Sequence, residues 1–64
     1  SMKWIDARVS KPGANELVLI YVAHMFRVAI YSHTRGQWLD AEELKAINGE
    51  FVTHWTPIYR PGGA

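Results

Sequence analysis

Cysteine is absent from this chain of 64 residues, and its absence excludes several classes of protein at once. No disulfide can staple the fold, no thiolate can bind a metal and no cysteine can act as a nucleophile. Three histidines are present at spacings that match no zinc motif, so the sequence predicts neither a metal site nor a cofactor. The composition fits a reducing compartment such as the cytoplasm.

An excess of charge of one sign is also missing, because the seven Lys and Arg residues are nearly balanced by six Asp and Glu residues. Strong attraction to nucleic acid or to an anionic membrane requires a clear basic excess, so the composition argues against both partners. Long hydrophobic runs are missing as well. The longest apolar run, residues 17–23, is far too short to cross a bilayer.

The short length predicts one domain, over residues 3–60, followed by a loose tail at residues 61–64. A chain of this size buries only about 60% of its unfolded surface, so its stability is expected to be small. Since neither a disulfide nor a metal is predicted, we expect a homo-oligomer to supply the missing stability.

Hydrophobic patterning predicts a mainly β domain of the α+β class, an antiparallel meander of three to four strands with one short helix. The run at residues 16–23 is apolar on both faces and predicts a central strand covered on two sides. Further extended segments are expected at residues 4–6, 26–32, 37–39 and 51–55.

The short helix is expected from Asp40 to residue 47. Asp40 is a good capping residue, and Glu43 three positions later forms a capping-box-like pair with it. Good helix formers follow, and the pair Asn48-Gly49 is typical of a helix end.

The junction between the first two long strands is apolar: His24, Met25 and Phe26 lie at the expected hairpin tip. Tight hairpins normally use Gly, Asn or Asp, and none is available here. Two interpretations remain open. The tip is a contact surface for a partner, or it folds back onto the core through a longer loop.

Several short motifs along the chain resemble those of a small phage and prophage family, the domain of unknown function 551 family. The matching stretches are Trp4-Ile5, Lys11-Pro12-Gly13, Leu17-Val18-Leu19, Ala29-Ile30-Tyr31, Gly36-Gln37-Trp38 and Val52-Thr53-His54-Trp55-Thr56-Pro57.

The resemblance covers nearly the whole chain, and the Thr-His-Trp-x-Pro ending is its most specific part. It implies a phage or prophage origin, a compact β-rich domain and a location in the cytoplasm of an infected bacterium. It implies no activity, so no catalytic residue is carried over. The chain departs from the family pattern at the apolar tip, at the helix-like residues 40–49 and at Tyr59.

Candidate ligand-binding residues are an arginine fork, aromatic faces and a histidine. Arg27 and Tyr31 share a strand face on either side of the small Ala29, which suits a nucleotide or phosphate. The predicted ligand-binding set is Arg27, Tyr31, Arg35, Trp38 and His54. Alternative interpretations are an exposed face with a cation–π pair for Arg27 and Tyr31, and a core position for Trp38. For His54 the alternative is a bond to a backbone carbonyl.

Three functions are expected from these residues taken together with the phage origin that the resemblance implies. None is enzymatic, because no nucleophile has an orienting base beside it. The first is a counter-defence protein that sequesters a small nucleotide-derived immune signal of the host. The second is an interaction module that inhibits or adapts a host defence protein through the apolar tip. The third is a nucleic-acid binder, which the near-neutral charge disfavours.

Overall fold

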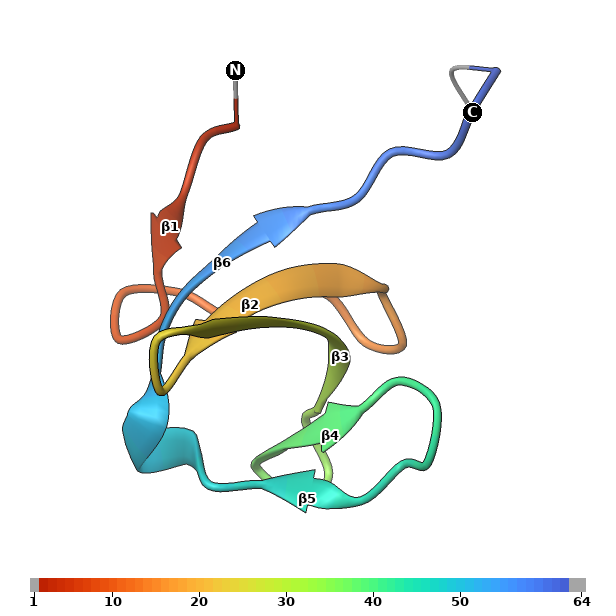
Figure 1. Ribbon diagram of the computed structural model, residues 1–64. Helices are drawn as coiled ribbons and strands as arrows, with labels where there is room; N and C mark the ends of the chain where they lie inside the picture. The colour runs from red at the N-terminus through yellow and green to blue at the C-terminus, as the bar shows by residue number, and fades with distance from the viewer. Residues whose placement is uncertain (1, 63–64) are drawn as a thin grey trace.

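The computed structural model describes residues 2–62, which form one antiparallel sheet of six strands (Figure 1). The spatial order is β1-β6-β2-β3-β4-β5. The elements are β1 (Ile5–Asp6), β2 (Val18–Val22), β3 (Met25–Ser32), β4 (Gln37–Asp40), β5 (Ala46–Ile47), the 3₁₀ helix η1 (Gly49–Phe51) and β6 (Val52–Pro57).

Strand β2 is central, as its apolar sequence predicts, and it pairs with β3 on one side and β6 on the other. Its alternate residues Val18, Ile20 and Val22 are buried on the inner face of the sheet. Leu19 and Tyr21 point to the outer face and are only half-buried. The expectation of cover on both faces therefore holds for the inner face alone.

Strand β3 bends the sheet, because it pairs with different neighbours along its length. Residues 25–29 pair with β2, and residues 29–32 pair with β4. Ala29 belongs to both pairings and is fully buried. Its small side chain leaves room for the sheet to curl, and Figure 1 shows the strands wrapping around the inner face.

The curled sheet is completed by η1, which carries the chain from the edge strand β5 back to β6. Asn48 begins this turn: its side-chain oxygen accepts a hydrogen bond from the Glu50 amide at 3.0 Å. β6 then lies between β2 and β1, so segments from both ends of the sequence meet around one core. The core cluster among the described residues is Ala7, Val18, Ile20, Val22, Ala29, Trp38, Val52 and Trp55.

The loop at residues 7–17 is fastened to the inner side of the sheet by side-chain hydrogen bonds. Trp55 Nε1 donates to the Ser10 carbonyl at 3.0 Å, and His33 Nε2 donates to the Pro12 carbonyl at 2.7 Å. Pro12 is itself fully buried. Trp55 thus packs in the core with its indole N–H satisfied by a loop carbonyl.

The predicted helix at residues 40–47 is wrong. The Asp40 carboxylate does accept hydrogen bonds from the Glu42 and Glu43 amides, at 2.7 and 3.0 Å, as a helix cap would. However, Leu44 adopts a φ of +59°, and the Asp40 amide bonds the Lys45 carbonyl, which closes a β-hairpin. Two isolated helical turns are unstable, whereas β5 gains pairing to β4.

The predicted count of three to four strands is also too low. The mainly β class is confirmed, but β1 and β5 have two residues each, too few to produce a readable alternation. Asn48-Gly49 opens η1 and does not end a helix. In the predicted tail, Pro61 and Gly62 are exposed, while residues 63–64 lie outside the described range.

The β2–β3 hairpin has a two-residue loop in which both residues lie in the left-handed region. Ala23 has a φ of +49° and His24 a φ of +65°, the backbone signs of a type I′ turn. A tight turn therefore forms without its usual residues, at an expected cost of roughly 1 kcal/mol for each side chain held there. The turn presents Met25 and Phe26, each 62% exposed.

We predict that Ala23→Gly raises the free energy of unfolding by about 0.5–1 kcal/mol, because glycine adopts a positive φ without steric conflict. Ala46→Gly is the matched control, since Ala46 is an exposed strand residue without a positive φ. It should lower stability by about 0.5–1 kcal/mol. Urea unfolding measures both, and an equal loss in the two variants would contradict the strained turn.

Candidate functional site

The five residues predicted to bind a ligand are distributed over two faces and a turn. Arg27 and Tyr31 lie on the inner side of β3, and Trp38 lies opposite Tyr31 on β4. Arg35 is in the exposed turn between β3 and β4. His54 is on the outer face of β6, across β2 from the others. One copy of the chain therefore does not gather the whole set in one pocket.

Arg27 is engaged by a carboxylate. Its Nη2 donates to Asp40 Oδ2 at 2.5 Å, across the β3–β4 pairing. The amides of Glu43 and Glu42 bond the same carboxylate. Together, the Glu43 amide first and then the Arg27 guanidinium and the Glu42 amide lower the pKa of Asp40 from 3.8 to about 2. Arg27 thus compensates the negative charge of Asp40 at the end of β4.

Tyr31 and Trp38 do come together, with ring centroids 5.0 Å apart in an edge-to-face arrangement. Trp38 is only 3% exposed, so it serves mainly as a core residue. Lys11 Nζ lies 5.7 Å from the Tyr31 ring centroid. Arg8 and Lys11 line a small hollow of about 180 Å³ beside the two rings. This volume is below the range typical of ligand pockets.

His54 belongs to a row of rings that crosses three strands on the outer face. Tyr21 lies opposite His54 of β6 and also opposite Phe26 of β3. The rings of Tyr21 and Phe26 are 5.3 Å apart. His54 Nδ1 lies 3.0 Å from Thr53 Oγ1, and no bond to a backbone carbonyl is formed by His54 within the described chain.

Trp4 completes this row. Its ring stacks on Phe26 at 6.0 Å with 29° between the planes, and it meets Tyr21 edge-on at 6.4 Å. Trp4, Tyr21, Phe26 and His54 line a shallow hollow of about 280 Å³, which we call the aromatic surface. Trp4 is half-buried and lies outside the core cluster.

Trp4 and Tyr21 were not among the predicted site residues, although one signal could have found Tyr21. Strand alternation places Tyr21 opposite in direction to the buried Ile20. A two-residue hairpin then sets Tyr21 against Phe26. The sequence carries no comparable signal for Trp4, because its position depends on where β1 joins β6.

The predicted interaction surface at the hairpin tip adjoins the aromatic surface. Phe26 belongs to both, and His24 Nδ1 lies within 3.5 Å of the Tyr21 hydroxyl. Met25, also 62% exposed at the tip, pairs with Val22 and points to the opposite side of β3 from Phe26. His54 of one predicted set and Phe26 of the other are therefore brought onto the same face.

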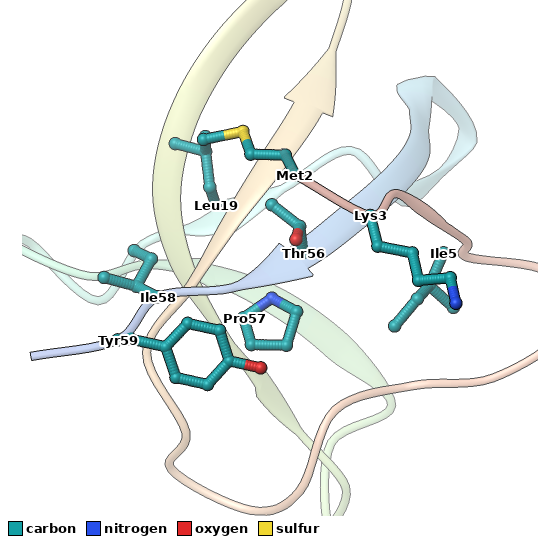
Figure 2. A pocket seen from close by; sticks show the side chains of 8 residues that line it. All are labelled: Met2, Lys3, Ile5, Leu19, Thr56, Pro57, Ile58 and Tyr59. Atoms are coloured by element: carbon teal, nitrogen blue, oxygen red, sulfur yellow. The ribbon is translucent and has the colours of Figure 1, made fainter. Parts of the chain in front are cut away.

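A second hollow, of about 570 Å³, lies where the two ends of the chain diverge. Figure 2 shows its walls: the N-terminal segment on one side and the segment that continues from β6 on the other. We call this hollow the chain-end groove. Its lining residues are Met2, Lys3, Ile5, Leu19, Thr56, Pro57, Ile58 and Tyr59.

Both hollows are lined by rings and aliphatic side chains, with Lys3 as their charged residue among the described residues. In residues 2–62, no three His, Asp or Glu side chains gather closely enough to hold a metal ion. Within the same range, no helix has the length and apolar character needed to cross a membrane.

Comparisons with known proteins match no family model, no curated protein and no solved structure. The resemblance to the domain of unknown function 551 family therefore stays a prediction, as does the homo-oligomer.

The lowered pKa of Asp40 predicts that the folded protein loses stability in acid. Because its pKa is lowered to about 2, its contribution to stability is complete above pH 3.8 and is lost as the pH falls towards 2. Asp40→Asn should be less stable at pH 7 and should lose less stability on acidification. Hydrogen bonds to Arg8 also lower the pKa of Asp6 to about 2. The Asp40→Asn variant should therefore keep the part of the pH dependence of stability that comes from Asp6.

Thermal unfolding of both proteins between pH 7 and pH 2 measures this effect. Parallel stability curves for the wild type and Asp40→Asn would contradict a stabilising role for the charged Asp40.

Proposed function

We propose that this protein is a non-enzymatic binding module that recognises another protein through the aromatic surface and the adjoining hairpin tip. The observation that carries the proposal is the exposed row of rings, with Phe26 62% exposed although it contacts both Trp4 and Tyr21. Monomeric proteins rarely display large contiguous apolar patches, and such patches mark interaction sites.

The chemistry of this surface suits a protein partner better than a phosphate-bearing ligand. No Lys or Arg lines the aromatic hollow. Binding of phosphate groups requires cations or a cluster of backbone amides. Aromatic residues and methionine, in contrast, are enriched in the centres of protein interfaces.

The strained turn supports the same proposal. A positive φ at Ala23 and His24 costs stability, and it places Met25 and Phe26 at the end of a stiff two-residue hairpin. Strained backbone is frequently retained near binding sites. Together with the resemblance to a phage family, this supports a bacterial host protein as the partner, which the module would inhibit or adapt.

We predict that Met25→Asp and Phe26→Asp each abolish capture of the partner from a bacterial lysate, because a charge in the centre of an apolar interface costs several kcal/mol. Leu44→Asp is the matched control, since Leu44 is 57% exposed but lies in the β4–β5 loop. Mass spectrometry of the proteins retained by each immobilised variant measures the effect.

Circular dichroism checks that each variant is folded. Retention of one protein by the wild type and by Leu44→Asp, but by neither tip variant, supports the proposal. Identical retention by all four proteins contradicts it.

A second candidate function is sequestration of a small nucleotide-derived signal. The small hollow beside Tyr31 and Trp38 favours this function. There Tyr31 and the edge of Trp38 lie beside Lys11 and Arg8, which combines rings with two cations. Native mass spectrometry of protein expressed in bacteria should then detect a stoichiometric bound mass, lost in Lys11→Ala. A ligand-free wild-type protein would contradict this function.

A further inference from the structure

The aromatic surface and the chain-end groove are neighbouring hollows, and we call the two together the track. Each of three segments contributes to both. Tyr21 and Leu19 are alternate residues of β2, and His54 and Thr56 are alternate residues of β6. In the N-terminal segment, Trp4 lines the first hollow, while its neighbours Lys3 and Ile5 line the second.

On β2 and β6, the residues that line the two hollows lie two positions apart. Residues two apart on one face of a strand are separated by about 6.6 Å. An extended peptide places its own alternate side chains at this same separation. Two apolar side chains at positions i and i+2 of an extended segment therefore match the two hollows.

The charge on the track is positive and lies at the chain-end groove. Lys3 is the single charged residue among the described residues that line either hollow, and Arg60 follows the lining residue Tyr59. None of the six acidic residues of the chain lines either hollow. A partner segment that complements this track is apolar and carries an acidic group at the chain-end groove.

Addition of a partner strand to the edge of β6 is disfavoured at the groove. Pro57 ends β6 and has no amide hydrogen to donate, and proline at a sheet edge hinders strand pairing. Docking at this place therefore depends on side chains, of which Ile58 is 42% and Tyr59 81% exposed.

We propose that the track binds an extended acidic-apolar segment of the partner, with apolar side chains at positions i and i+2 and an Asp or Glu that reaches Lys3. This inference rests on the proposed function and specifies the partner segment that the aromatic surface and the groove take together.

Selection of random twelve-residue peptides against the immobilised protein tests the proposal, followed by fluorescence anisotropy of the enriched peptides. The enriched peptides should carry two apolar residues at alternate positions next to Asp or Glu. Ile58→Asp should weaken their Kd at least tenfold, and Lys3→Glu about fivefold or more. Leu44→Asp should leave the Kd unchanged.

Lys3→Glu also tests the charge preference of the groove, because an unfolded variant would lose binding but would not reverse the preference. Selection against this variant should favour peptides that carry Lys or Arg in place of the acid, because the charge at the groove is reversed. Arg35→Glu makes the same charge change in the distant β3–β4 turn, and it should retain the preference for acidic peptides.

The outcomes separate this inference from the proposed function. Peptides that lose binding in Phe26→Ala but not in Ile58→Asp or Lys3→Glu would overturn the track and leave the aromatic surface as the site. No enriched peptide, or peptides that are basic against the wild type, would overturn the acidic-apolar segment. A dimer in sedimentation that Ile58→Asp converts to a monomer would assign the groove to a second copy and overturn the proposal.

Discussion

A single sheet has two faces to cover, and a chain of 64 residues has enough apolar side chains to cover only one of them completely. The sheet meets this constraint by curling around its inner face, with Ala29 at the place where the pairing of β3 passes from β2 to β4. The loop at residues 7–17 then closes over the core through the bonds of Trp55 and His33. Both tryptophans of the core, Trp38 and Trp55, depend on this arrangement.

The outer face shows the consequence of that division. β2 is apolar on both sides, yet Leu19 and Tyr21 remain half-buried because residues 2–62 form no second layer over them. Trp4 and Phe26 give Tyr21 partial cover and are themselves left in contact with solvent. An apolar face that the chain cannot bury by itself is suited to binding, and it connects the stability of the fold with its proposed role.

Local sequence signals predict the chemistry of single residues better than they predict the extent of the elements. Asp40 bonds the two amides that a capping residue should bond, but Leu44 turns the chain into a hairpin before a helix can continue. The pairing of Ala46 and Ile47 with Leu39 and Trp38 decides the outcome, and that pairing is a tertiary interaction. Likewise, Ala23 and His24 form a tight turn that their own conformational preferences disfavour.

The sequence by itself determined the mainly β class, the central place of β2 and the alternation of β3, because these depend on periodicity and on chain neighbours. Only the tertiary structure decided which side chains share a face. The pairing of β6 with β2 placed His54 beside Tyr21 and away from Arg27, and the pairing of β1 with β6 brought Trp4 onto the same surface. Such neighbours come from segments distant in sequence, whose register no local pattern encodes.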